Sequence, residues 1–159
     1  ADLISMYQAT RSQGLGIEVK RRIMLGTYAL SAEYYDEYYG TAQRARRMIT
    51  EDFRSVFDDG VDALFTPTSP TPAFKVGEHP AVIDGVAVPD KLWGFTPFTY
   101  PFNMCGNPAA TAPAGFSSDG LPIGLHIVGR WGDEETVMAA SKAFEDGRPW
   151  ADKRPAGFE

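Results

Sequence analysis

The sequence has a single cysteine, Cys105, among its 159 residues, so an internal disulfide and a zinc site built from cysteines are both excluded. The thiol lies between Met104 and Gly106 in an apolar stretch, and nothing nearby would stabilise a thiolate. We therefore predict a buried, unreactive cysteine and not a nucleophile.

Long apolar runs are absent too. None approaches the roughly 18 to 20 residues that a helix needs to cross a bilayer. The opening run ADLISMYQATRSQ lacks the basic start and the continuous apolar stretch of a signal peptide. The composition, 43% hydrophobic and 23% charged, is typical of a soluble globular protein, which we expect to be cytoplasmic. The chain also lacks an initiating methionine and begins within a helical pattern, so we expect further sequence upstream.

Several catalytic motifs are missing: there is no G-x-S-x-G elbow, phosphate-binding loop or dinucleotide fingerprint. Ser69, in the run TPTSPTP, and Ser117 and Ser118 are better explained by turn chemistry than by nucleophilic catalysis. His79 and His126 have no partner at the spacing of a metal site, so we predict no metal ligand. For His126 we expect a partly buried, hydrogen-bonded position in a strand.

The net charge of −6 disfavours a broad electrostatic contact with nucleic acid. Positive charge gathers in two clusters: Lys20, Arg21 and Arg22, and then Arg44, Arg46 and Arg47. Acidic residues follow the second cluster closely, which favours solvated helix faces over a nucleic-acid site.

Apolar periodicity predicts helices over four stretches: 2–12, 18–39, 41–58 and about 134–147. Asp133 is a natural N-cap for the last helix, and Glu134 and Glu135 suit the positive end of its dipole.

Three short strands are predicted. Residues 61–66 (VDALFT) end at Pro67, which is typical of a short buried strand. Residues 109–114 and 121–128 flank the run Ser117-Ser118-Asp119-Gly120, which is typical of a hairpin turn. Along the later strand two sets of side chains alternate between faces: Leu121, Ile123, Leu125 and Ile127 on one, and Gly124, His126 and Val128 on the other.

Residues 67–92 hold five of the twelve prolines and form a long irregular excursion, which is typical of a lid or binding loop. Residues 92–105 are dense in large apolar side chains and predict a buried helix or turn that is broken near Pro97 and Pro101. Helices and strands interleave, so we predict an α/β layered fold in one segment, residues 1–159. Three strands are few for so much helix, so we expect the sheet to continue outside this chain.

Several runs resemble the amidase signature family of serine amidases. EVKRRIMLGTYALSAEYYDEYY (18–39), AQRARRMITEDF (42–53) and VDALFTPTSPTPAFKVGE (61–78) are very similar to the A subunit of tRNA-dependent amidotransferases, a branch of that family. Residues 101–130 resemble the C-terminal part of the family, whereas FTYPFN and the GRPW and KRP runs look more like stand-alone bacterial amidases. The pieces occur in the family's order along nearly the whole chain.

The resemblance implies the C-terminal part of an α/β/α sandwich with a mixed β-sheet. It also implies a hydrolase that cleaves a carboxamide through an acyl-enzyme, with a Ser–cis-Ser–Lys triad whose lysine acts as base through the bridging serine. The triad belongs to the family's N-terminal half, and the Gly/Ser-rich nucleophile segment and upstream lysine are not in this sequence. No catalytic residue is therefore assigned in this chain.

Substrate-binding positions follow from the same resemblance. Arg22, or Arg21 by a one-residue ambiguity, would bind the α-carboxylate of glutamine, since a guanidinium can donate two parallel bonds to a carboxylate. An arginine that ties two helices together is an equally good interpretation. Thr96 stands where the amidotransferase A subunit has an aspartate for the glutamine ammonium, which favours a neutral or aromatic amide. Three aromatic side chains would line the pocket for such an amide: Trp93, Phe95 and Phe98.

Partners depend on which branch of the family applies. An amidotransferase A subunit would function with B and C subunits and use ATP bound elsewhere in the complex, whereas a stand-alone amidase would be a homodimer without a cofactor. In both cases the N-terminal half of the same domain would be a partner, and we expect no membrane binding and no direct nucleic-acid binding. Two alternatives stay open: a non-catalytic scaffold that retains half the fold, and a nucleic-acid-binding module, which has only the basic clusters in its favour.

Overall fold

The computed structural model describes residues 2–31, 34–75, 82–83, 86–87, 97–147, 153–155 and 157. The chain divides into two compact units, residues 1–47 and residues 48–159, which we call the helical unit and the sheet unit. The long helix α3, Thr41–Asp58, includes the boundary between them and has the bounds predicted from its periodicity.

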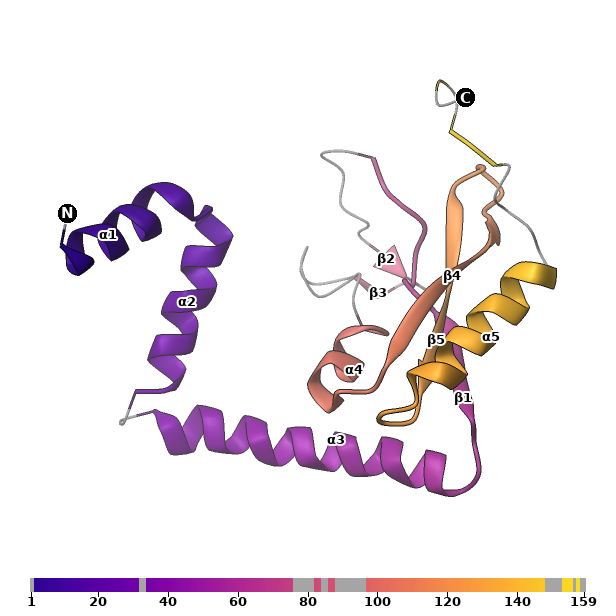
Figure 1. The fold of residues 1–159 in the computed structure, drawn as a ribbon, viewed down its shortest axis with the longest axis horizontal. Helices are drawn as coiled ribbons and strands as arrows, with labels where there is room; N and C mark the ends of the chain where they lie inside the picture. Colours follow the sequence, from indigo (N-terminus) through magenta and orange to yellow (C-terminus); the bar gives the residue numbers. More distant parts are fainter. Residues whose placement is uncertain are drawn as a thin grey trace. The chain divides into compact units, whose positions relative to one another are not determined.

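The helical unit contains α1, Leu3–Ala9, a π-helical turn over Thr10–Gly14, α2, Ile17–Ala29, and a second π-helical turn over Tyr35–Gly40 (Figure 1). Asp2 is the N-cap of α1, because its carboxylate accepts a 2.8 Å hydrogen bond from the Ser5 amide.

The prediction of one helix over residues 18–39 is wrong, because α2 ends at Ala29. The carbonyl of Tyr28, which a continuing helix would use further along, accepts the Ser31 amide at 3.1 Å and the Ser31 hydroxyl at 2.7 Å. A serine that bonds a nearby carbonyl in this way offers the backbone an alternative to the helix.

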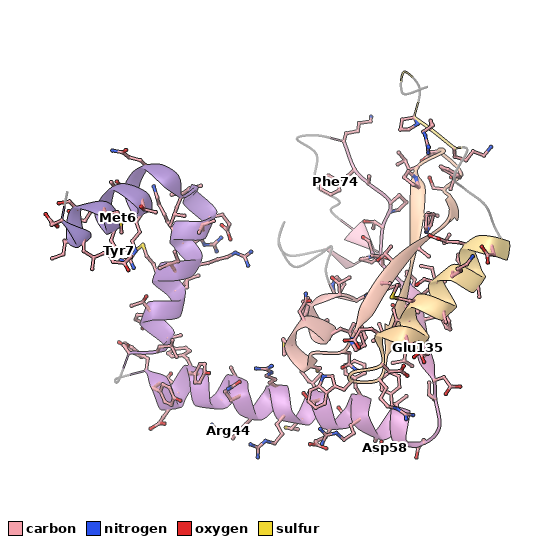
Figure 2. The ribbon with its side chains drawn as sticks, in the orientation of Figure 1. Met6, Tyr7, Arg44, Asp58, Phe74 and Glu135 are labelled. Carbon is pink, nitrogen blue, oxygen red and sulfur yellow. The ribbon has the colours of Figure 1, made fainter. Side chains whose placement is uncertain are left out.

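None of the described residues in α1, α2 and the two π-helical turns is buried. Their large apolar side chains are exposed instead: Leu3, Ile4, Met6, Tyr7, Ile17, Val19, Ile23, Met24, Leu25, Tyr28 and Leu30. Figure 2 shows Met6 and Tyr7 on α1. The apolar side chains on which the helix predictions rest therefore do not pack into a core among the described residues of the helical unit.

The sheet unit is built on three antiparallel strands in the order β1-β5-β4: Ala63–Pro67, Pro122–Gly129 and Ala109–Phe116 (Figure 1). A separate antiparallel pair joins β2, Val82–Ile83, to β3, Val86–Ala87, within the excursion predicted over residues 67–92. Strand pairs of the described residues are all antiparallel, so the parallel part of a mixed sheet is not among them.

The predicted hairpin between β4 and β5 is confirmed. The Gly120 amide bonds the Ser117 carbonyl at 2.9 Å, the Leu121 amide bonds the Ser117 hydroxyl at 3.1 Å, and Gly120 has a φ of 78°. Glycine suits this left-handed position because it has no Cβ. β4 is longer than predicted, because an irregularity between Pro113 and Gly115 lets the pairing continue to Phe116.

The central strand β5 is buried in its second half, His126–Gly129, and its side chains alternate between two faces as predicted. Val128 packs with Phe57 from α3 and Phe102 from α4, Tyr100–Cys105. Ile127 packs on the other face with Ala112 and with Val137 from α5, Glu134–Gly147. The two clusters make a layered α/β arrangement around β5.

Two local predictions near the ends of these elements had different outcomes. Asp133 caps α5, since its carboxylate accepts the Thr136 amide at 3.2 Å, and Glu135 lies in the first turn (Figure 2). Pro101, predicted as a break, lies in the first turn of α4, where a helix does not use the amide that proline lacks.

The predicted strand β1 is present but is only half-buried, with Phe65 54% exposed. It is the last strand on its side of the described sheet, so no further described strand covers it.

Candidate functional site

The sheet unit has a groove of about 580 Å³ where β1 ends. We call it the hydroxyl groove. It is lined by Pro67, Thr68, Ser69, Pro70, Thr71, Pro72, Ala73, Phe74, Thr111, Pro122, Ile123 and Gly124. Its rim carries Phe74, which is 45% exposed (Figure 2). Apolar walls with a few polar atoms are typical of small-molecule sites.

Contacts within the sheet position two threonines that line the hydroxyl groove, Thr68 and Thr111. The Thr68 amide bonds the Gly124 carbonyl at 3.0 Å, one step beyond the last β1–β5 pair. The Thr68 hydroxyl lies 3.4 Å from the hydroxyl of Thr111 on β4. A Cβ on Gly124 would come within 2.7 Å of Thr68 Oγ1 and of Thr111 Cγ2. Glycine at position 124 therefore lets the two threonines meet across β5.

One residue that lines the groove, Thr71, has a buried hydroxyl group. Thr71 Oγ1 is buried and, among the described residues, makes no hydrogen bond. A buried hydroxyl without a partner costs free energy, and most buried polar groups in proteins are satisfied. Because this atom is closed off from solvent, a molecule in the groove would reach it only after the neighbouring groups moved.

His126 lies on the same face of β5 as Gly124, two residues further along. It is 5% exposed, its Nδ1 lies 3.5 Å from Thr66 Oγ1, and its ring makes an edge contact with Phe102 at 5.4 Å between centroids. Burial lowers the pKa of His126 below its ordinary value of 6.5, and a hydrogen bond to the backbone of Phe98 partly opposes this. The predicted strand position and hydrogen bond of His126 are confirmed, and the side chain is buried more deeply than the partial burial predicted.

A second cavity, of about 250 Å³, lies at the C-terminal end of α3 and has a structural role. The Arg130 guanidinium donates a 2.9 Å bond to the Phe57 carbonyl, and the Arg54 guanidinium lies 5.3 Å above the Trp131 ring. Asp58 also lines this cavity (Figure 2). Arg130 thus satisfies a carbonyl in the last turn of α3. The sequence offered no signal for this contact, because its two ends are far apart along the chain.

The predicted carboxylate-binding arginines share one partner. Arg22 Nε lies 3.0 Å and Arg21 Nη1 3.4 Å from the carboxylate oxygens of Glu18, and both arginine side chains are 63% exposed. They belong to the helical unit, whereas the hydroxyl groove belongs to the sheet unit. Exposed pairs of this kind contribute at most about 1 kcal/mol to stability. Thr96 and Phe95, with Trp93, lie outside the described residues, and Phe98, within them, is 36% exposed.

Cys105 is enclosed by the fold, and five of the serines bond local partners. Cys105 is buried, as predicted, and Ser117 serves the hairpin turn. Elsewhere in the described part of the chain, no serine hydroxyl bonds a lysine or histidine side chain; four serines donate to carbonyls of their own helical segments: Ser12, Ser31, Ser55 and Ser141. Within the same residues, no three histidine, cysteine, aspartate or glutamate side chains gather as metal ligands. No described helix is long and apolar enough to span a bilayer.

The family model described as Amidase matches residues 1–138. The A subunit of glutamyl-tRNA(Gln) amidotransferase from Geobacter metallireducens is 49% identical over 150 residues, which cover 94% of this chain and 30% of that protein. The protein of the same name from Brevibacillus brevis is 50% identical over 155 residues, which cover 98% of this chain and again 30% of the relative. The chain thus spans about 30% of the length of the curated relatives it matches.

Solved structures agree with these sequence relatives. The glutamyl-tRNA(Gln) amidotransferase A subunit from Thermotoga maritima superposes with a TM-score of 0.62 at 37% identity, covering 89% of this chain and 30% of that structure. A bacterial aryl acylamidase of the amidase signature family superposes with a TM-score of 0.67 at 28% identity, covering 96% of this chain and 34% of that structure. Both likenesses extend over most of the chain.

Proposed function

We propose that this chain, which belongs to the amidase family, forms the C-terminal part of a serine hydrolase that cleaves a carboxamide. The match of the family model to residues 1–138 is the observation that carries the proposal, and the names of the relatives support it. In such an enzyme a serine attacks the amide carbon, ammonia or an amine leaves, and water then releases the acid from the acyl-enzyme.

The nucleophile, the bridging serine and the lysine base are proposed to come from polypeptide outside these 159 residues. The chain spans only about 30% of its curated relatives, and no described serine hydroxyl bonds a lysine or histidine side chain that would activate it as a nucleophile. The exposed apolar side chains of the helical unit support the same view, because they offer surface for further parts of the domain to cover.

The contribution of this chain is proposed to be one wall of the amide pocket, formed by the hydroxyl groove. Its volume of about 580 Å³ suits a small amide, and threonine hydroxyls can both donate to a carbonyl and accept from an NH₂ group.

The arginine pair on α2, Arg21 and Arg22, would distinguish two substrate classes: glutamine, which has an α-carboxylate, and a neutral or aromatic amide, which has none. If the protein is a glutamine amidase, Arg22 or Arg21 exchanges Glu18 for the substrate α-carboxylate, and the protein works with B and C subunits and ATP held elsewhere. If it is a stand-alone amidase, Thr96 and Phe95 favour a neutral or aromatic amide, and a homodimer without a cofactor is the natural assembly. A cytoplasmic location fits both.

Ammonia release by the full-length protein tests the proposal, with glutamine and benzamide as the two substrates. We expect hydrolysis of at least one of them and none by residues 1–159 alone. The Arg22→Ala change should raise KM for glutamine by about tenfold or more, through loss of a charge-assisted pair, and leave benzamide within about twofold. Lys20→Ala, on the same helix and bonded to the Ser12 carbonyl, is the matched control.

A non-catalytic scaffold is the competing function, and the absence of an activated serine among the described residues favours it. Failure of the full-length protein to release ammonia from either substrate, with the fold intact, would establish the scaffold and end the enzymatic proposal.

A further inference from the structure

The cavity at the C-terminal end of α3, which we call the arginine cavity, lies away from the hydroxyl groove. Its walls include Asp58, which ends α3, and Arg130, which follows β5, whereas the groove is lined by Pro122, where β5 begins. A strand rises about 3.4 Å per residue, so the eight residues of β5 place the two roughly 20 Å apart. Figure 2 shows Asp58 and Phe74, a residue of the groove, at opposite ends of the sheet unit. The arginine cavity is therefore separate from the proposed substrate wall.

One wall of the arginine cavity is the guanidinium of Arg54, which lies over an indole ring. Its central carbon is 5.3 Å from the centre of the Trp131 ring. This contact uses the face of the guanidinium and none of its five N–H donors, which lie in its plane. One of its nitrogens, Nη1, lies 3.3 Å from the Glu51 carboxylate, and no other described residue accepts from the group. Arg54 is thus oriented by Trp131 and keeps donors for a further acceptor.

A second guanidinium, that of Arg130, lines the cavity from the turn after β5. Its Nη2 donates a 2.9 Å bond to the Phe57 carbonyl, and its other N–H groups have no acceptor among the described residues. The end of β5 is itself fixed, because the Gly129 amide bonds the Pro108 carbonyl and the Asn107 side chain bonds the Gly129 carbonyl, both at 2.9 Å. Two arginines from different elements therefore line one cavity, each anchored through only part of its guanidinium.

The Trp131 ring forms an apolar wall beside these two groups. It is 49% exposed but contacts the C-cap of α4 as well as Arg54. A Cβ at the capping residue, Gly106, would come within 2.9 Å of the indole Nε1, and the φ of 82° at this position also favours glycine. Glycine at position 106 thus leaves room for the indole, whose contacts hold it in place at the surface.

The charges of the arginine cavity suit an anion. Arg54 and Arg130 supply two positive charges, and Asp58 supplies one carboxylate on an exposed side chain, where solvent screens it. The C-terminal end of α3 is partly negative, but Arg130 already bonds one of its carbonyls. A guanidinium can donate two parallel bonds to a planar carboxylate. The volume of about 250 Å³ is below the roughly 300–1,000 Å³ of pockets for drug-sized ligands, so the cavity suits a small molecule.

We propose that the arginine cavity binds a small carboxylic acid with an apolar body: the carboxylate pairs with the guanidiniums of Arg54 and Arg130, and the body packs on Trp131. This inference goes beyond the proposed function and does not require it, since the cavity is separate from the hydroxyl groove. If the protein hydrolyses benzamide, the acid that it releases belongs to this class.

Benzoate is the probe for the test, and benzyl alcohol is its neutral counterpart, which an amidase cannot hydrolyse. The full-length protein is titrated with each, so that any polypeptide that covers the cavity is present. The nitrogen–proton magnetic resonance signal of the Trp131 indole, identified by its loss in Trp131→Phe, reports binding at this cavity and not at the hydroxyl groove. We expect a saturable shift with benzoate, with a Kd of about 1 mM or below, and none with benzyl alcohol.

Three variants separate this site from a general effect of charge. Arg54→Gln should raise the Kd for benzoate about tenfold or more, because a charge-assisted pair is lost. Arg130→Lys keeps the charge and a donor for the Phe57 carbonyl but loses the fork, and should raise Kd about threefold. Lys142→Gln removes the same charge from an exposed position on α5 and is the matched control, with Kd within about twofold.

An unshifted Trp131 signal at millimolar benzoate, an equal shift with benzyl alcohol, or an unchanged Kd in Arg54→Gln would overturn the proposal. If Arg130→Lys does not fold, Arg54→Gln decides alone, because Arg54 is an exposed side chain with no bond to the backbone of another element. Failure of the full-length protein to hydrolyse any amide would end the proposed function and leave this test intact, because the Trp131 signal requires no turnover.

Discussion

In both the helical unit and the sheet unit, apolar residues recur at the spacing of a helix or a strand. The two units differ in how far these apolar side chains are buried. In the sheet unit, Ile127 and Val128 are fully buried between two clusters, with α5 on one face and α3 and α4 on the other. In the helical unit, α1 and α2 have no buried residue. Amphipathic periodicity thus establishes that a helix has a face to bury, but not that the chain at hand supplies what buries it.

Hydrogen exchange on residues 1–159 should show the largest difference between the two units. We expect amides of β5 to exchange at least about 1,000-fold more slowly than amides of α2, because isolated helices of this length are marginal in water. Mass spectrometry after peptide digestion measures both regions in one sample. Equal protection in the two units would mean that the helical unit has a core, contrary to the exposure of its side chains.

Replacing one isoleucine in each unit by alanine tests the same difference in burial through the free energy of unfolding. Ile127→Ala should lower the free energy of unfolding by about 2–5 kcal/mol, because it leaves a cavity between β5 and α5. Ile23→Ala, at a side chain 45% exposed on α2, should change it by no more than about 0.5 kcal/mol. Urea unfolding followed by tryptophan fluorescence reports both values. A large effect at Ile23 would show that α2 unfolds together with the sheet.

Replacing one glycine in each unit by alanine should give a smaller difference in stability than the two isoleucine substitutions. Gly124→Ala should destabilise the sheet unit by about 1–3 kcal/mol, since the new methyl group would meet Thr68 and Thr111 at 2.7 Å. Gly26→Ala, in α2 with no atom within 4 Å of the new Cβ, should increase helicity and stabilise α2 by up to about 1 kcal/mol. Circular dichroism during thermal unfolding measures each change. If Gly124→Ala is tolerated without loss, the Thr68–Thr111 contact across β5 is not part of the stable structure.

The two aspartate N-caps, Asp133 of α5 and Asp2 of α1, should also differ in how much their loss lowers stability. Asp133→Ala should cost about 1 kcal/mol of unfolding free energy, because the Thr136 amide loses its acceptor at the start of α5. Asp2→Ala removes the corresponding bond to the Ser5 amide, but should lower only the helical signal and leave the main unfolding transition unchanged. A shift of the main transition by Asp2→Ala would connect α1 to the cooperative unit.

The smallest predicted effect is a pH dependence of stability that belongs to the sheet unit alone. The pKa of His126 is lower in the folded protein than its ordinary value of 6.5, so the unfolded chain binds more protons between these two values. The contribution of His126 is therefore complete above pH 6.5 and is lost as pH falls toward the folded pKa. Urea midpoints measured from mildly acidic to mildly alkaline pH should show this slope, and His126→Gln should reduce it; an unchanged slope would assign it to other groups.

The elements predicted correctly are those whose cause is local. α3 follows from a three-to-four spacing of apolar residues within one helix, the β4–β5 turn from Ser117 and Gly120, and the cap of α5 from Asp133. The failures also have identifiable causes. The helix predicted over residues 18–39 ends early because the Ser31 hydroxyl bonds the Tyr28 carbonyl, and Pro101 begins a helix because the first turn does not need its amide.

The sequence by itself determined most of the helical and strand segments, the hairpin, the buried cysteine and a resemblance specific enough to predict the family. Only the tertiary structure decided which side chains meet: Gly124 lets Thr68 approach Thr111, Arg130 bonds the Phe57 carbonyl, and His126 lies between Thr66 on β1 and Phe102 on α4. These contacts join residues that are far apart along the chain. They depend on strand register and on helices packed across the sheet, and neither local propensity nor short-range spacing specifies that geometry.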